Sequence, residues 1–172
     1  FHDKTGNADQ IETTLSLDEF PSPEALWERY KVWKGLSQQS EELVTSQEYQ
    51  YLSEEQPRYY QQLAVNRTIE AIARGQKRIL LAMATGTGKT RTAFNIIWRL
   101  WKTRKAKRIL FLADRNILVD QTMINDFKPF GSVMTKLNRS LVDKDNGKVD
   151  TSYEIYLSLY QAIIGGEDSE PI

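Results

Sequence analysis

The chain has 172 residues, of which 40% are hydrophobic and 27% are charged, proportions that are ordinary for a globular domain. It contains no cysteine, which excludes disulfides and thiolate metal sites, and its one histidine, His2, argues against histidine-based metal binding or catalysis. No run of roughly eighteen apolar residues occurs, so the sequence predicts no membrane-spanning helix.

The acidic and basic side chains are equal in number but unevenly distributed. Residues 1–56 carry 12 acidic and 4 basic side chains, a balance of −8, whereas residues 57–172 carry a balance of +8. This change predicts a boundary near Ser53–Pro57 and a second part whose surface suits polyanions. Because the chain begins at Phe1 and its last residues read as a loop, we expect it to be a piece of a longer protein.

The acidic first part is predicted to contain a short arm followed by helices. The first twenty residues read as the end of a β-hairpin or a frayed arm, with a turn-like stretch inside. A helix should follow, because Ser22 can cap it, Pro23 suits its first position and Gly35 suits the residue past its end. Residues 36–56 are polar and acidic, which indicates a linker with helical character.

The second part opens with a predicted helix and a predicted strand. The helix is expected over residues 60–73, where Val65, Ile69 and Ile72 recur at helical spacing. The run Arg78–Met83 is apolar from its second residue onward. A continuous apolar run is typical of a strand that is covered on both faces in a parallel sheet.

The predicted elements then alternate. A helix over residues 89–108 separates the first apolar run from a second one at Arg108–Ala113, and strand, helix and strand together form a βαβ unit. A third helix is expected over residues 114–127, and a further strand at Glu154–Tyr160 leads into a short helical stretch. The predicted fold class is therefore α/β, with a mostly parallel sheet flanked by helices.

The stretch Met83–Thr90, MATGTGKT, has the composition of a phosphate-binding loop. Such a loop needs glycines where a side chain would block the backbone N–H groups, a lysine that reaches the β- and γ-phosphates, and a hydroxyl for Mg²⁺. The N-terminus of the following helix also attracts phosphate. The general pattern begins with glycine and this loop begins with methionine; the alternative is a glycine-rich turn without a ligand. We predict a nucleotide site formed by Thr85, Gly86, Thr87, Gly88, Lys89 and Thr90.

Four stretches together resemble the motor subunit of type I restriction-modification enzymes, a superfamily 2 helicase-like DNA translocase. Arg58–Gln61, RYYQ, is similar to the adenine-recognition motif of that family, and MATGTGKT is the family's form of the phosphate loop. Leu112–Gln121 resembles motif Ia, with one residue more between its arginine and its glutamine than the DEAD-box form has. Tyr156–Ile163 resembles motif Ib. RYYQ alone is a weak signal, but four motifs in the expected order are a strong one.

The resemblance covers most of residues 18–165, and Asp18–Tyr30 is similar to the family's connector between nuclease and motor domains. It implies that residues 1–56 are an acidic connector with the end of an upstream nuclease domain. Residues 57–172 would then be the N-terminal part of the first RecA-like lobe. The parent would be a cytoplasmic restriction endonuclease in which hydrolysis of ATP with Mg²⁺ drives translocation of double-stranded DNA before cleavage. Its partners would be the specificity and methylation subunits.

The resemblance also implies roles for single residues. Lys89 and Thr90 would be catalytic, with Thr90 holding Mg²⁺. Gln61 would read the adenine base and Arg58 would lie near it; the alternatives are that Gln61 only starts a helix and that Arg58 is solvated. Arg115 opens a predicted helix, where a DNA phosphate would offset the unfavourable dipole. The expected DNA contacts are Arg115, Gln121, Ser158, Tyr160 and Gln161.

Two features near the centre of the chain have ordinary explanations. The basic run Arg99–Arg108 reads as a solvated helix end rather than a DNA groove, because positive charge suits a helix C-terminus. Trp98 and Trp101 read as core residues rather than as platforms on which bases stack.

Some parts of a complete motor are not in this sequence. No apolar run that ends in Asp-Glu follows Ile164, and neither a second lobe with its arginine nor a nuclease motif can be found. Hydrolysis needs such acids to hold Mg²⁺ and to orient water, so we expect the 172 residues alone to bind nucleotide weakly and not to turn it over. The alternatives are another superfamily 2 motor, such as a type III restriction subunit or a DEAD/DEAH helicase, and a non-catalytic nucleotide-binding regulatory module.

Overall fold

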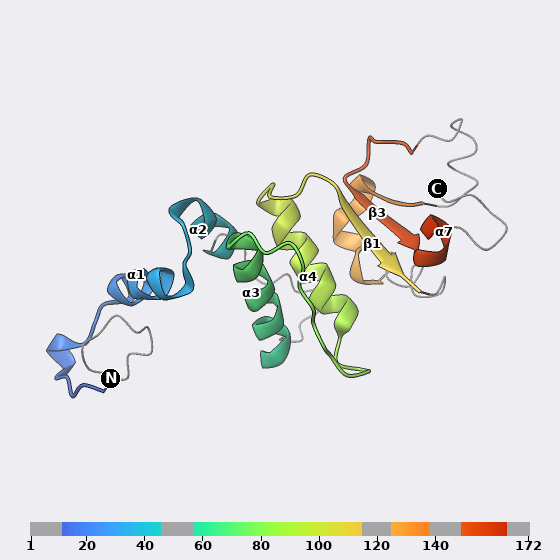
Figure 1. Cartoon of the computed structure of the whole chain (residues 1–172). Helices are drawn as coiled ribbons and strands as arrows, with labels where there is room; N and C mark the ends of the chain where they lie inside the picture. Colours follow the sequence, from blue (N-terminus) through green and yellow to red (C-terminus); the bar gives the residue numbers. More distant parts are fainter. Residues whose placement is uncertain (1–11, 46–56, 115–124, 138–148, 165–172) are drawn as a thin grey trace.

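The structure is a computed structural model that describes residues 12–45, 57–114, 125–137 and 149–164 (Figure 1). Most of the predicted arm and of the predicted third helix lie outside these ranges. The described elements are η1 (Leu17–Glu19), α1 (Pro23–Lys34), α2 (Gln38–Thr45), α3 (Tyr59–Ala73), α4 (Lys89–Lys102), β1 (Ile109–Ala113), η3 (Lys128–Val133), β2 (Met134–Lys136), β3 (Ile155–Leu159) and α7 (Tyr160–Ile164).

The three described strands form one parallel sheet in the order β1-β3-β2. In the central strand, residues 155–158 are buried, and Ile155 pairs with both Ile109 and Met134. This parallel sheet with flanking helices confirms the predicted α/β class and is consistent with part of a RecA-like lobe. The strand β2 was not predicted, because its three residues, Met-Thr-Lys, are too few and too mixed to show a period.

The prediction of a strand at Arg78–Met83 is wrong: this segment has no regular secondary structure and belongs to no ladder among the described residues. Leu80 is 92% exposed, and Ile79 and Leu81 are about two-fifths exposed. A continuous apolar run becomes a buried strand only where a neighbouring strand supplies hydrogen bonds and helices cover both faces. The described strand β1 pairs only with β3, on one of its sides. Of the predicted βαβ unit, the helix (α4) and the second strand (β1) form, but the first strand does not.

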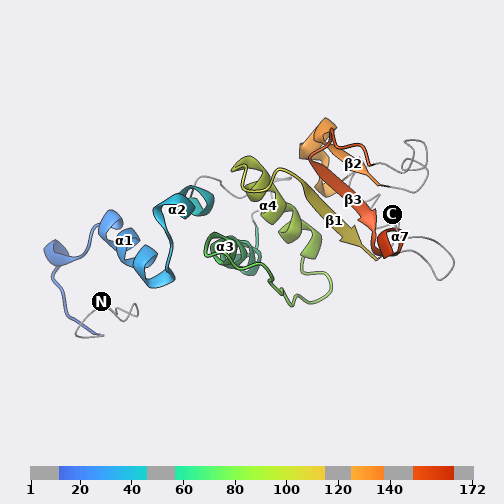
Figure 2. The ribbon, with the colours of Figure 1, turned by 45° about the horizontal axis from the view of Figure 1, so that its top comes forward.

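Helix α4 lies between α3 and the sheet in both views (Figures 1 and 2) and packs a hydrophobic core on each side. On the sheet side, Phe94 is fully buried, with its ring centroid 5.6 Å from that of Phe127 and 5.2 Å from that of Phe130. Trp98 and Trp101 pack against this cluster, which confirms that they are core residues.

On the other side of α4, a smaller core joins the N-terminal helices to the lobe. Its fully buried members are Val65 and Ile69 of α3, with Leu43 of α2 almost fully buried beside them. Val65 and Ile69 belong to the apolar face that the helical spacing predicted. Helix α3 ends as predicted near Gly75, whose φ of +85° suits glycine and whose N–H donates to the carbonyl of Ile72 at 2.9 Å.

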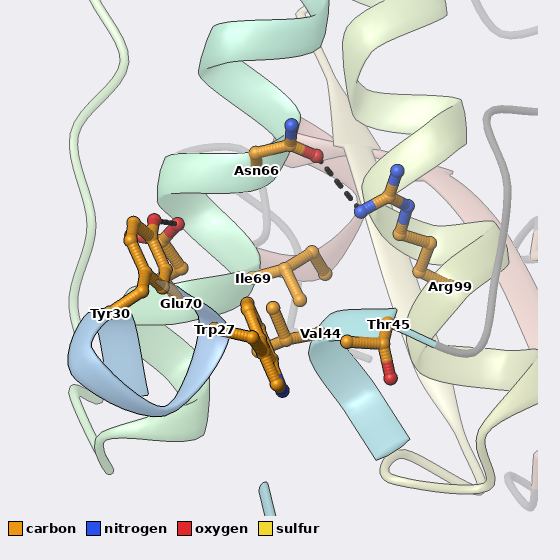
Figure 3. Close-up of a pocket in the computed structure, with 8 residues that line it drawn as sticks. All are labelled: Trp27, Tyr30, Val44, Thr45, Asn66, Ile69, Glu70 and Arg99. Atoms are coloured by element: carbon orange, nitrogen blue, oxygen red, sulfur yellow. Dashed lines mark hydrogen bonds between the residues drawn. The ribbon is translucent and has the colours of Figure 1, made fainter. Parts of the chain in front are cut away.

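Helix α1 has the predicted boundaries and contacts α3 through polar groups. The Ser22 hydroxyl accepts from the N–H of Ala25 at 3.2 Å, and Gly35 follows the helix with a φ of +62°. The Tyr30 hydroxyl donates to the carboxylate of Glu70 on α3 (Figure 3). The hydrogen bond from Tyr30 to Glu70 joins α1 to α3.

The contact between α1 and α3, here called the junction, contains a buried carboxylate: Glu70 is only 5% exposed. Its second carboxylate oxygen has no hydrogen-bond partner among the described residues. It lines a cavity of about 320 Å³ among α1, α2, α3 and α4, together with Arg99, which donates to Asn66 at 3.0 Å (Figure 3). Burial and the hydrogen bond to Glu70 raise the pKa of Tyr30 to about 12.

The aromatic core predicts a large cost for Phe94→Ala in the 172-residue chain. We expect a loss of roughly 3–5 kcal/mol of unfolding free energy, since the cavity left among three aromatic rings cannot close fully. Urea unfolding measures it. Leu80→Ala is the control: it should change stability by no more than about 0.5 kcal/mol, because Leu80 is exposed. A cost of several kcal/mol for Leu80→Ala would show that this run is buried after all.

The junction predicts a cost of roughly 1–3 kcal/mol for Tyr30→Phe, because a buried carboxylate then loses its partner. The double variant Tyr30→Phe/Glu70→Leu should recover part of this loss.

Unfolded Tyr30 releases its proton near pH 10 and folded Tyr30 near pH 12, so the wild-type free energy of unfolding should fall across that interval. Identical pH dependence in wild type and Tyr30→Phe would contradict the assignment of this hydrogen bond.

Candidate nucleotide-binding site

The predicted phosphate loop leads directly into α4. Gly88 is the N-cap residue of the helix, with a left-handed φ of +81°, and Gly86 has a φ of +77°. Both conformations favour glycine. Because α4 runs antiparallel to β1, the N-terminus of α4 and the carboxyl end of β1 lie at the same end of the lobe (Figure 1). The helix N-terminus therefore faces the edge at which open parallel sheets bind ligands.

The loop is held in shape by its own hydrogen bonds. The Thr87 hydroxyl donates to the carbonyl of Ala84 at 2.6 Å. The Lys89 ammonium donates to the same carbonyl at 3.1 Å and lies 3.4 Å from the carbonyl of Met83. Lys89 is thus exposed but turned toward the loop, and its ammonium can exchange these carbonyl oxygens for those of an anion. Thr90, the next residue, lies in the first turn of α4 and is half-buried.

Gln61 joins the RYYQ stretch to the phosphate loop. Its side-chain carbonyl accepts from the N–H of Arg58 at 3.1 Å, which caps α3, and its side-chain N–H donates to the carbonyl of Thr87 at 2.9 Å. A Cβ atom at Gly88 would lie 2.3 Å from the Gln61 nitrogen and would displace this amide from Thr87, while the φ of Gly88 by itself favours glycine. Gln61 therefore starts a helix and also contacts the loop, and its amide keeps a second N–H and further acceptor capacity.

A largely apolar cavity of about 370 Å³ lies beside the loop, between α3 and residues 81–84. Sequence analysis missed the α3 residues that line it. Tyr60, Ala64 and Arg67 recur at helical spacing on the face opposite the buried one, and this period was the available signal. Arg58 does not line the cavity; its guanidinium donates to the Tyr60 hydroxyl at 2.9 Å.

The residues expected to contact DNA are only partly described, since Arg115 and Gln121 lie outside the described ranges. Tyr160 is 55% exposed, and Gln161 donates to the carbonyl of Asp114 at 3.2 Å, which ties the end of β3 to the end of β1. Ser158 is fully buried, and its hydroxyl lies 3.3 Å from the carbonyl of Leu137. In this structure the Ser158 side chain stabilises the sheet and does not face the surface.

The basic run after the loop helix differs from the prediction. The helix ends at Lys102 instead of Arg108, and Arg104 has a positive φ of +55° that ends the helical geometry. Arg99 is only 8% exposed, so it is not solvated as expected. Arg99 faces α3 and donates a hydrogen bond to Asn66. This contact joins residues far apart in sequence, so no local pattern reveals it.

Among the described residues no group of three His, Cys, Asp or Glu side chains is arranged to hold a metal ion. Nor does any described helix combine the length and the apolar character needed to cross a bilayer.

In comparisons with known proteins, the chain is similar to subunits of restriction enzymes. Residues 54–170 match the family described as "Type III restriction enzyme, res subunit". Over 171 residues, 99% of the chain, the sequence is 53% identical to the type I restriction enzyme EcoAI endonuclease subunit of Escherichia coli. Over 66 residues, 38% of the chain and 6% of the relative, it is 56% identical to the EcoKI endonuclease subunit of Escherichia coli strain K12.

A solved structure agrees with these matches. A fragment assigned to the HsdR subunit of a type I restriction enzyme from Vibrio vulnificus YJ016 superposes with a TM-score of 0.66 at 37% identity, covering 86% of this chain and 25% of that one. The chain spans only 20% of the length of the EcoAI relative. The chain therefore belongs to the family of the restriction (R) subunits of type I restriction enzymes, as one segment of such a subunit.

Proposed function

We propose that this segment is the ATP-binding part of a DNA translocase motor, in which ATP hydrolysis drives double-stranded DNA past the enzyme before cleavage. The observation that supports this most is the contact of Gln61 with Thr87 and Gly88. It brings an adenine-motif residue onto the phosphate loop across 26 positions of sequence. A glycine-rich turn without a ligand has no need of such a contact.

The loop residues fit ATP and Mg²⁺ in shape and charge. No atom lies within 4 Å of the place where a Cβ of Gly86 would be, so a ligand can approach the backbone there. The backbone N–H groups of residues 85–90 would hold phosphate oxygens, Lys89 would neutralise the β- and γ-phosphates, and Thr90 would hold Mg²⁺. When bound, Mg²⁺ would stabilise the charge that develops on the transferred phosphoryl group.

Gln61 would give this site its preference for adenine. One of its N–H groups is used by Thr87, and the other can donate to the N7 atom of a base while the side-chain oxygen accepts from N6. Arg58, which caps α3 through its backbone, would lie near the base. The apolar cavity beside the loop, lined by Tyr60 and Leu63, offers room for a nucleoside on the same side of α3.

The wider assembly follows from the family. Residues 1–56 would connect an upstream nuclease domain to the motor, and residues 57–172 would form the N-terminal part of its first lobe. The carboxyl ends of β1 and β3 would contribute Arg115, Gln121 and Gln161 to a DNA-binding rim next to the ATP site. The partners would be the specificity and methylation subunits of a cytoplasmic restriction complex.

Lys89→Ala in the full-length parent should reduce DNA-stimulated ATP hydrolysis by roughly 100-fold or more, because the loop loses its only cation at the γ-phosphate. The thermal unfolding midpoint should stay unchanged, since Lys89 is exposed. Lys77→Ala, which removes another exposed lysine, is the control and should retain activity. Near-normal hydrolysis by Lys89→Ala would refute the motor; normal nucleotide binding without any hydrolysis by the wild type would indicate a regulatory module.

Gln61→Ala in the parent should lower ATP affinity by roughly fivefold to tenfold, the value of one hydrogen bond, and should reduce discrimination against GTP. Fluorescent ATP and GTP analogues measure both affinities. The neighbouring Gln62→Ala is the matched control and should behave as wild type. An equal loss of affinity for both nucleotides would mean that Gln61 supports the loop through Thr87 and does not read the base.

A further inference from the structure

The basic run Arg99–Arg108 holds six cations, and three of them have contacts that explain their positions. Arg99 donates to Asn66, Arg104 forms an ion pair with Glu154 at 2.8 Å, and Lys102 lies over the rings of Trp98 and Trp101. By contrast, the side chains of the remaining cations are exposed and form no ion pair with any described residue; they are Lys105, Lys107 and Arg108.

We propose that two of these cations, Lys107 and Arg108, belong to a second DNA-binding surface, which holds the phosphate backbone of double-stranded DNA. The surface is a groove of about 490 Å³, here called the amino-end groove, lined by Lys107, Arg108, Thr151, Ser152, Tyr153 and Glu154. The inference rests on the proposed function, in which the parent moves DNA.

The groove is formed where two neighbouring strands begin. Lys107 and Arg108 come directly before β1, and residues 151–154 come directly before β3. The strands pair in parallel from Ile109 opposite Ile155, and the N–H of Ile109 donates to the carbonyl of Glu154 at 2.9 Å. The groove therefore lies at the opposite end of the sheet from α7 and the N-terminus of α4 (Figure 1). DNA bound there would not compete with a nucleotide at the phosphate loop.

The wall of the groove that precedes β3 is already ordered by hydrogen bonds. The N–H of Ser152 donates to the carboxylate of Asp150 at 2.9 Å. The Tyr156 hydroxyl lies 2.8 Å from the carbonyl oxygens of both Asp150 and Tyr153. A preorganised wall lowers the entropy cost of binding.

The acidic groups near the groove are occupied by other donors. Glu154 accepts from the indole N–H of Trp101 and from Arg104, and these donors hold the pKa of its carboxyl below the ordinary value. The backbone N–H and hydroxyl of Ser152 lower the pKa of Asp150 in the same way. Both carboxylates therefore stay negatively charged at neutral pH, and Glu154 forms an ion pair with Arg104. Lys107, Arg108 and Arg104 together exceed the two carboxylates by one positive charge.

The lining chemistry favours a phosphate backbone over an acidic protein. Lysine, arginine, serine, threonine and tyrosine side chains make most contacts to DNA phosphates. Of these types the groove offers Lys107, Arg108, Ser152, Thr151 and Tyr153. Of the groove residues, only Tyr153 and Arg108 are of the kinds that anchor protein interfaces, whereas all five are of the kinds that contact phosphate.

The test uses the full-length parent and a duplex without a recognition sequence. Its DNA affinity is measured between roughly 50 and 200 mM salt, where each lost phosphate contact lowers the slope of log K against log salt by about 0.9. Lys107→Gln/Arg108→Gln should therefore reduce the slope by about two. ATP hydrolysis without DNA should be unchanged. Lys107→Arg/Arg108→Lys keeps both charges and should retain the wild-type slope.

A matched control removes two cations far from the groove: Arg29→Gln/Lys34→Gln on α1 should leave the slope unchanged. An equal slope in the groove variant and the wild type overturns the amino-end groove but leaves the proposed function standing. Weaker association with the other subunits at an unchanged DNA slope also overturns it and identifies a protein-binding surface. Absence of DNA binding by the wild type overturns the proposed function together with the groove.

Discussion

The close approach of the Gln61 amide to Gly88 is the constraint on which the rest of the site depends. A Cβ at the start of α4 would displace this amide, and the hydrogen bond to Thr87 requires the first turn of α3 to lie over the phosphate loop. One hydrogen bond to a carbonyl is weak by itself. Here it acts together with a left-handed backbone at Gly88 and with the cap that Gln61 provides for α3. Loop shape and helix position are therefore fixed by the same side chain.

The position of α4 gives this contact its support. One face of the helix buries Phe94 and Ile97 against the sheet, and the other packs against α3, so the helix cannot shift without disturbing two cores. Interiors packed at this density resist small displacements. The start of α4 is consequently held from three directions, although the loop itself is exposed. A stable support beneath an accessible loop is what phosphate binding requires.

Local signals predicted much of this arrangement. The caps at Ser22 and Gly35, the apolar period of α3, the strands β1 and β3 and the glycine loop could all be read from a few neighbouring residues. Strand β2 was missed because it is too short to show a period, and two other failures depended on partners distant in sequence. Arg78–Met83 has the composition of a buried strand but no ladder partner among the described residues. Arg99 was predicted to be solvated, but it is buried against Asn66 of α3. The family resemblance, by comparison, predicted the correct family from four short motifs.

Two of the long-range contacts of α3, those of Gln61 and Glu70, constrain the number of residues between them. Gln61 and Glu70 are nine residues apart, which separates them by roughly 13 Å along the axis and places them on opposite sides of the helix. One side therefore faces the phosphate loop while the other faces Tyr30. A single residue inserted between them would rotate one contact by about 100° relative to the other. Side chains in this stretch can vary, but the count of residues cannot change without separating the N-terminal helices from the loop.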